Sequence, residues 1–220
     1  MARTVRKTPL LLRAALAALL TIALALALAP GAAVRAGEAA AGRGAVPPYE
    51  RAAFCDWRAR DRDGWTTRQR ILFERSIGPR VIWWSRHGPR VIRGSWRDAW
   101  SGRIWRDVDP RGRLEIDHVV PLSFAWRHGA HAWPAARREA FCHDPDNLIV
   151  VARHWNRAKG DTGADRLLPL RPDLACAYLE RFLAVSLRYG LALSPAERTD
   201  LELNRRAACE KATTPRAPQS

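Results

Sequence analysis

Residue types suited to phosphodiester hydrolysis occur mid-chain, in the order Asp117 and His118, then Asn147, then Asn156 and Lys159. Hydrolysis of this bond requires a water molecule, a base that deprotonates it and positive charge near the leaving oxygen. His118 is a candidate base because an unperturbed histidine pKa of about 6.5 lies near working pH. Asp117 and Asn156 offer oxygen ligands that a hard divalent cation prefers. These residues together predict one metal ion beside a histidine base.

A strand–strand–helix unit would bring these groups together. Apolar residues over 114–122 predict a strand, and residues 148–151 predict a second strand after a turn. Residues 154–159 then predict a helix that Gly160 closes. Adjacent residues of a strand point to opposite faces, so a local distortion or a backbone group must orient the aspartate and the histidine together.

The segments on the N-terminal side of this unit predict helix and hairpin. Residues 49–77 are polar and helical in pattern, and residues 78–96 repeat Gly-Pro-Arg-Val-Ile, which predicts the two strands of a hairpin. Residues 96–110 predict loop with short strand pieces. Residues 132–141 predict a helix with a proline in its first turn.

The last third of the chain is helical in pattern. Apolar residues share one helical face at Leu174, Tyr178, Phe182, Val185 and Tyr189. Ser194 and Glu197 flank a proline and form a capping-box pattern that starts a final helix to about residue 209. Cys176 and Cys209 would then lie on adjacent helices that a disulfide could join.

The N-terminus has the pattern of an export signal. Four basic residues precede an Ala/Leu run over 14–29, and small residues suit cleavage after residue 36. The alternative is a membrane anchor, but the run is shorter than the roughly 20 residues that span a bilayer. We expect a signal peptide at 1–36, a disordered lead-in at 37–48 and a disordered tail at 211–220, with no stable membrane association after cleavage.

Composition favours an oxidising compartment and a polyanionic partner. The four cysteines of an exported chain favour two disulfides, and without a C-x-x-C pair a thiolate zinc site is disfavoured. The formal charge is +15, and +10 remains once the five basic residues of the signal are removed. Such a domain attracts polyanions by counterion release. Charge alone does not separate a nuclease from a binder of anionic envelope polymers.

Other aromatic residues and histidines carry less information. His87 falls in a turn, and we expect structural or solvated roles for His128, His131, His143 and His154. The tryptophans are dense over residues 83–105. Most should be core residues, although one or two could stack on unpaired bases.

Taken together, the central segments resemble the HNH motif. They are Ile116-Asp117-His118-Val119-Val120-Pro121-Leu122, Phe141-Cys142-His143-Asp144, Asp146-Asn147-Leu148 and Asn156-Arg157-Ala158-Lys159-Gly160-Asp161. More narrowly, the chain resembles exported bacterial HNH endonuclease-family proteins of the DUF1524 or GmrSD C-terminal-like group. The resemblance extends from residue 49 to residue 191 and so covers nearly all of the mature chain.

The resemblance implies an α+β fold with a ββα-metal core, helical flanks and a small β-hairpin. It implies one divalent ion, Mg²⁺ or Mn²⁺, held by Asp117 and Asn156, with His118 as general base. By the same resemblance Asn147 holds the loop and helps to orient this base.

Further roles follow from the same resemblance. Lys159 would approach a phosphate or brace the motif, and Arg68 is a candidate phosphate contact. We therefore expect a nuclease domain over 49–210 that acts as a secreted monomer on nucleic acid, DNA before RNA. The products would carry 5′-phosphate and 3′-hydroxyl ends.

The cysteine positions depart from the pattern of these relatives. Many relatives have one cysteine before the Thr-Arg element at 67–68 and another before the Gly-x-Trp element at 94–96, where this chain has none. Cys55 and Cys142 occur elsewhere instead. We therefore predict that these two pair with each other, and that Cys176 pairs with Cys209.

Two other classes of function compete with the nuclease. The first is a non-catalytic exported module that binds nucleic acid or an anionic cell-surface polymer. The second is a toxin-like nuclease delivered to competitors, for which no delivery module is evident. Dependence on a metal and on His118 separates the enzyme from the binding module.

Overall fold

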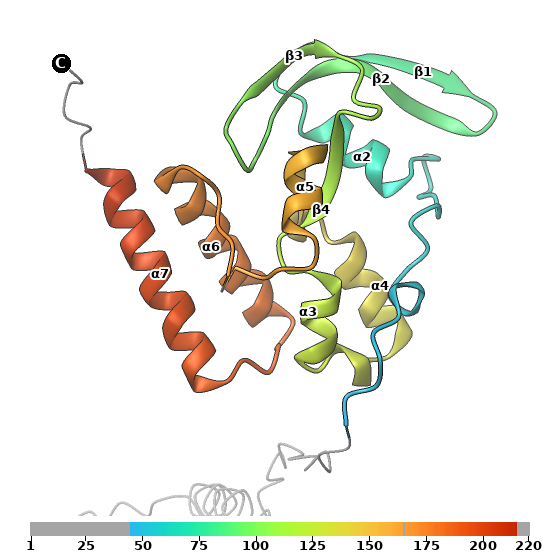
Figure 1. The fold of residues 1–220 in the computed structure, drawn as a ribbon. Coiled ribbons are helices and arrows are strands. Elements are labelled where there is room, and N and C mark those ends of the chain that lie inside the picture. The colour runs from blue at the N-terminus through green and yellow to red at the C-terminus, as the bar shows by residue number, and fades with distance from the viewer. Residues whose placement is uncertain (1–44, 165, 215–220) are drawn as a thin grey trace, which may run out of the picture. The chain divides into compact units, whose positions relative to one another are not determined.

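The computed structural model describes residues 45–164 and 166–214, so the predicted signal peptide lies outside it. Two antiparallel sheets and a set of helices make a mixed α and β fold (Figure 1). In chain order the elements are η1 (Arg51–Ala53), α2 (Thr67–Glu74), β1 (Val81–Ser85), β2 (Gly88–Arg97), β3 (Ile104–Val108), β4 (Leu114–His118), α3 (Leu122–Arg127), η2 (Ala130–Ala132), α4 (Ala135–His143), η3 (Pro145–Asn147), β5 (Leu148–Ala152), α5 (Arg153–Lys159), α6 (Pro172–Arg188) and α7 (Pro195–Thr213). Within the described ranges, no helix has both the length and the apolar composition of a membrane span.

The predicted strand–strand–helix unit is present as β4, β5 and α5. The two strands pair antiparallel, with Asp117 opposite Ile149 and His118 opposite Leu148. All residues of β5 are buried, in keeping with its continuous apolar sequence. Gly160, whose positive φ of 57° favours glycine, ends α5 as predicted.

The predicted hairpin is the edge of a three-stranded sheet in the order β1-β2-β3. Its turn lies at residues 86–87, and Ile82 of the first sequence copy pairs with Val91 of the second. Trp96 is buried, whereas Trp83 and Trp84 on the edge strand are exposed. The segment 96–110, predicted as loop with short strand pieces, contains the strand β3, which pairs with β2.

Two segments differ from the sequence-based expectation. Residues 54–66 are mostly loop rather than helix, because the Asp61 carboxylate accepts from the backbone nitrogens of Asp63 and Trp65 and Gly64 has a φ of 80°. These bonds form a turn that a helix cannot contain. In addition, α3 was not predicted; it follows Pro121 directly and is almost entirely buried.

The core has two parts, and β4 connects them. Leu114, at the start of β4, packs under the three-stranded sheet with Trp96 and Leu148. Val119 and Val120, just after β4, pack in a second cluster around α3, α4 and α6. The last residues of β4 are thus fixed between two packed regions, which suits a site that needs exact side-chain placement.

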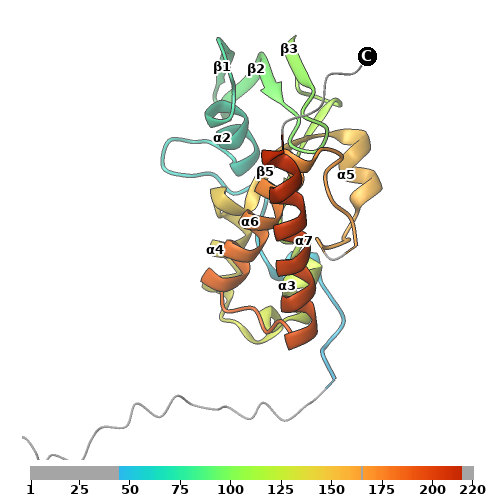
Figure 2. The ribbon, with the colours of Figure 1, turned by 90° about the vertical axis from the view of Figure 1, so that its left-hand side faces the viewer.

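The C-terminal helices α6 and α7 lie side by side in both views (Figures 1 and 2). Tyr178, Phe182 and Val185 of the predicted apolar face are buried. The Cys176–Cys209 disulfide joins the two helices, and the second disulfide joins Cys55 to Cys142, both as predicted. The helix α7 runs to Thr213 and so includes the first residues of the expected tail, since no glycine or proline stops it earlier.

The predicted capping box at Ser194 and Glu197 is present. The Glu197 carboxylate also accepts a hydrogen bond from Nε2 of His128, the residue that ends α3. Burial would raise the pKa of Glu197, but hydrogen bonds from His128 and Ser194 outweigh it and lower the pKa from 4.5 to about 2. The depressed folded-state pKa stabilises the protein above pH 4.5, and this contribution is lost as the pH falls toward about 2.

We therefore expect Glu197→Gln to lower the free energy of unfolding near neutral pH. The loss should be on the order of 1 kcal/mol or less, because the carboxylate is partly exposed and screened. Urea unfolding at a series of pH values should show the difference shrinking below pH 4.5. A difference that stays constant down to pH 2 would contradict the assignment.

Candidate active site

The predicted site residues gather where β4 meets α5, which lie alongside each other (Figure 1). Several side-chain contacts join these elements. The Lys159 ammonium lies 2.9 Å from Oδ2 of Asp117, and Nδ2 of Asn156 donates to Oε2 of Glu115 at 2.7 Å. Asp117, His118 and Asn156 all line one cleft of about 350 Å³.

Asp117 is buried and neutralised by a single cation. Lys159 donates to Oδ1 at 3.2 Å; it lies closer to Oδ2 but without hydrogen-bond alignment. Burial raises the pKa of Asp117, while the ammonium of Lys159 opposes that shift. The carboxylate thus keeps one buried oxygen, Oδ2, without an aligned donor.

His118 is held by two contacts on its ring. Nε2 lies 2.9 Å from the carbonyl oxygen of Cys142, and the indole of Trp57 stacks on the imidazole at 5.5 Å between centroids. A carbonyl only accepts, so Nε2 carries the proton and Nδ1 is left with its lone pair. Burial lowers the pKa of His118 to about 3, against the hydrogen bond to Cys142, so the ring is neutral at working pH.

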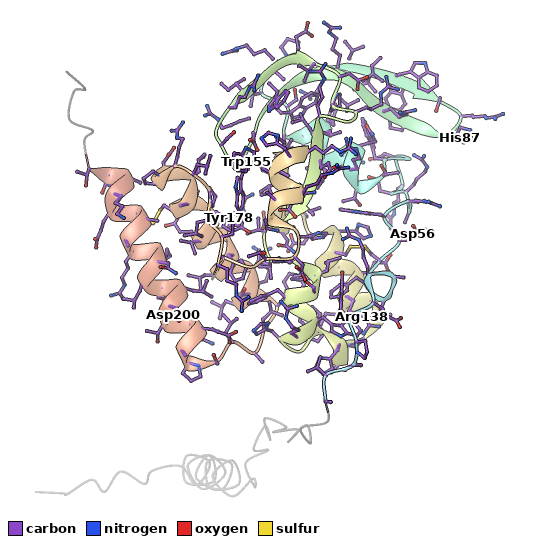
Figure 3. The ribbon with its side chains drawn as sticks, in the orientation of Figure 1. Asp56, His87, Arg138, Trp155, Tyr178 and Asp200 are labelled. Atoms are coloured by element: carbon purple, nitrogen blue, oxygen red, sulfur yellow. A yellow bond between two sulfur atoms is a disulfide. The ribbon has the colours of Figure 1, made fainter. Side chains whose placement is uncertain are left out.

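Asn147 fastens the chain directly after His118. Its Oδ1 accepts from the Val120 nitrogen at 2.8 Å, and its backbone oxygen accepts from the Val119 nitrogen at 2.8 Å. The side chain is fully buried. Tyr178 points inward from α6 and donates to the Val119 oxygen at 2.8 Å (Figure 3). This stretch is therefore fixed from two sides.

Lys159 and Arg68 both bond to the protein itself. Besides Asp117, Lys159 donates to the backbone oxygen of His118 at 3.1 Å and is 2 % exposed. Arg68 donates to the oxygen of Leu114 at 2.9 Å. Of the two roles considered for Lys159, phosphate contact and bracing of the motif, this geometry suits bracing. Arg68 holds the start of β4 and also lines a neighbouring cleft.

The remaining histidines belong to the scaffold or to the surface. Nδ1 of His143 pairs with the Thr67 hydroxyl at 2.6 Å, and His128 binds Glu197. His154 is exposed on α5, and His87 lies at the outer tip of the β1–β2 hairpin (Figure 3). None of them lines the cleft that holds Asp117 and His118.

Comparison with known proteins places this arrangement in a family. The family model described as "GmrSD restriction endonucleases, C-terminal domain" matches residues 66–201. The chain belongs to this family. The matched range of this GmrSD C-terminal domain contains the five predicted site residues of the cleft and its surroundings, which are Asp117, His118, Asn147, Asn156 and Lys159.

One curated relative is an "Uncharacterized secreted protein" from the fungus Arthroderma benhamiae (strain ATCC MYA-4681 / CBS 112371). It is 36 % identical over 110 residues, which are 49 % of this chain and 52 % of the relative. The chain thus spans about half the length of this relative, and the likeness is not confined to bacterial proteins. No solved structure matches the chain.

Of the two residues that the sequence reasoning missed, one lies inside the matched range of this GmrSD C-terminal domain and one lies before it. Glu115 holds the amide of Asn156; its position two residues before Asp117, on the same strand face, was the available signal. Trp57 lies N-terminal to the matched residues, and its contact with His118 had no signal in the sequence.

An arginine-rich cleft of about 550 Å³ adjoins the site. Its lining includes Arg51, Arg58, Arg60, Arg68 and Asn156. Arg51 and Arg58 are exposed, and neither guanidinium has a hydrogen-bond or ion-pair partner among the described residues. The sequence offered only a high local density of arginine as a signal for this cleft.

Proposed function

We propose that this protein is an exported, metal-dependent endonuclease whose ββα-metal core consists of β4, β5 and α5. The observation that carries the proposal is His118, which is fixed through Nε2 to the Cys142 oxygen, keeps Nδ1 without a hydrogen-bond partner among the described residues and lines the same cleft as Asp117. Export is supported by two disulfides and by the fungal relative, which is named a secreted protein. Because the family is named for restriction endonucleases, DNA is the first substrate to test, ahead of RNA.

The donor atoms suit one hard divalent cation, Mg²⁺ or Mn²⁺. Asp117 offers the buried Oδ2 that lacks an aligned donor. The Glu115 carboxylate only accepts, so it must face the amino group of Asn156 and leave that residue's Oδ1 directed away from it. When bound, a divalent cation stabilises negative charge on the phosphate and on the leaving 3′ oxygen.

The chain's own residues then supply the base and its orientation. Nδ1 of His118 takes a proton from water, and the hydroxide attacks phosphorus in line with the 3′ oxygen. The P–O3′ bond breaks, and the 3′ oxygen takes a proton from solvent. Asn147 and Cys142 keep the imidazole in place through the backbone contacts described above.

The end chemistry of the products tests this route. Cleavage of an end-labelled oligonucleotide with Mg²⁺ or Mn²⁺ should leave 5′-phosphate and 3′-hydroxyl ends, which a ligase can rejoin. EDTA should stop the reaction. Products with 3′-phosphate or cyclic-phosphate ends would rule out this mechanism even if the protein cuts.

Glu115 should matter for metal affinity through Asn156. Glu115→Ala removes the acceptor that orients the Asn156 amide, and we expect the affinity for Mn²⁺ to fall about 10- to 100-fold. Glu115→Gln keeps an acceptor oxygen and should lose much less. Calorimetric titration with Mn²⁺ measures both; equal affinity in Glu115→Ala and the parent would contradict the orienting role.

The arginine cleft should contribute to binding and its salt dependence. Replacing both Arg51 and Arg58 with alanine should weaken DNA binding and reduce the slope of log K against log salt by roughly 0.9 per lost phosphate contact. Replacing both Arg198 and Arg206 with alanine is the matched control, because it also removes two exposed arginine charges, here from α7, which contributes no residue to the cleft. Equal slopes for the parent and the double variant at Arg51 and Arg58 would contradict this role.

A further inference from the structure

We infer that the Cys55–Cys142 disulfide positions the imidazole of His118, so that cleavage depends on the redox state of this bridge. The inference rests on the proposed function, in which His118 is the base. It concerns how the His118 ring is held in place, and each cysteine of the bridge contributes to one contact with that ring.

Cys142 supplies the first contact to the ring. It lies in the last turn of α4, where a carbonyl oxygen has no partner further along the helix. This oxygen is therefore free to accept from Nε2 of His118 at 2.9 Å. Because this bond fixes the proton on Nε2, the position of the Cys142 backbone decides where Nδ1 points.

Cys55 supports the second contact to the ring, which Trp57 makes. Trp57 lies two residues after Cys55 and stacks on His118, with 26° between the ring planes. The residues from Asp56 to Asp63, Trp57 excepted, are exposed, and Asp56 is seen on this outer segment in Figure 3. Cys55 is thus the last covalently fixed residue before the exposed loop.

The bridge joins these two supports of the ring to each other. Without it, the segment that carries Trp57 remains attached through Phe54 in the core and through the bond from Arg138 to the Ala53 oxygen. Those anchors precede Cys55. Beyond it, Trp57 is then held only by non-covalent packing, against His118, His143 and the core cluster that contains Leu114. Cys55 and Trp57 also lie N-terminal to the matched range of 66–201, so this support lies outside the matched part of the chain.

The other disulfide provides a contrast within the same molecule. Cys176–Cys209 joins α6 to α7, and neither cysteine contacts His118. Reduction of either bridge takes two electrons and two protons from a dithiol reductant, which is oxidised to its own disulfide. Only the reduction of Cys55–Cys142 should loosen the base. An exported chain would then gain full activity only after oxidation outside the cytosol.

The first test compares two disulfide-deficient variants. The variant Cys176→Ser with Cys209→Ser should keep the parent's kcat when oxidised and lose it on treatment with dithiothreitol. The variant Cys55→Ser with Cys142→Ser should have a kcat lower by about 10- to 100-fold in both conditions, as expected for a misplacement near 1 Å, with little change in KM. Mass mapping checks the thiol state of each sample.

Two further measurements keep the inference testable if the second variant fails to fold. Trp57→Ala should lower kcat with both disulfides intact, and Trp57→Phe should recover most of the loss because a phenyl ring also stacks. In metal-free, histidine-labelled protein, the Nε2–H resonance of His118 should be protected from exchange when oxidised and lose that protection on reduction.

The outcomes separate this inference from the proposed function. An oxidised parent that cuts nothing in any metal contradicts the proposed function. A parent that cuts equally well after complete reduction of Cys55–Cys142, or a Trp57→Ala variant with the parent's kcat, overturns only the positioning role of the bridge. Unchanged exchange of the His118 Nε2–H on reduction would do the same.

Discussion

We expect His118→Ala to lower the rate of DNA cleavage by about 10²- to 10⁴-fold, the range for the loss of a positioned general base. The imidazole presents Nδ1 because Nε2 is committed to the Cys142 oxygen, and no other histidine lines the cleft. The measurement is the initial rate of nicking of supercoiled plasmid at saturating Mg²⁺. Added imidazole should restore part of the rate, since a free base can enter the space left by the side chain.

His154→Ala is the matched control for this prediction. His154 is exposed on α5, two residues after the end of β5, and lines no part of the Asp117 cleft. Its replacement should leave the rate near that of the parent. Equal rates for the parent and His118→Ala, at equal purity and with the same melting temperature, would remove His118 from the chemistry.

The second large effect is on stability and comes from Lys159. Lys159→Met leaves the Asp117 carboxylate buried without its cation, and we expect the metal-free protein to lose about 3–5 kcal/mol of unfolding free energy. Both side chains are nearly inaccessible, with exposures of 1 % for Lys159 and 10 % for Asp117. Urea unfolding of oxidised protein in EDTA measures the loss.

A double-mutant cycle supplies the control for Lys159. Adding Asp117→Asn to Lys159→Met removes the unpaired charge, so the double variant should be more stable than Lys159→Met alone. Mg²⁺ should also stabilise Lys159→Met, because an ion bound at Asp117 replaces the missing positive charge. A Lys159→Met protein as stable as the parent would show that the pair is not the brace described here.

The local elements around the site could be predicted because their sequence patterns are short-range. The apolar run at 148–151, the glycine after Lys159 and the capping box at Ser194 each specify a conformation within a few residues. The order of Asp117, Asn147 and Asn156 along the chain then indicated which elements must meet. Those elements do meet in the structure.

The contacts that hold the base could not be predicted, because they join residues far apart in sequence. The bond from His118 to the Cys142 oxygen depends on where α4 ends against β4, and no residue type marks an accepting carbonyl. The stacking of Trp57 depends on a loop whose turn at Asp61 replaced the expected helix. Lys159 could be read as a phosphate ligand until its burial was known.

The same cleft would look different in a non-catalytic binding module. Exposed arginines such as Arg51 and Arg58 would be enough to attract DNA. Such a module would have no use for a buried imidazole that the Cys142 oxygen holds through Nε2, or for a carboxylate oxygen buried without an aligned donor. These two buried groups favour the enzyme.

The most direct test is digestion of plasmid DNA by purified, oxidised mature protein, with Mg²⁺ or Mn²⁺ in one series and EDTA in the other. We predict nicking and linearisation in at least one of the metals and none in EDTA. Retardation of the plasmid on a gel without cutting in any metal would contradict the enzyme and identify the protein as a binding module.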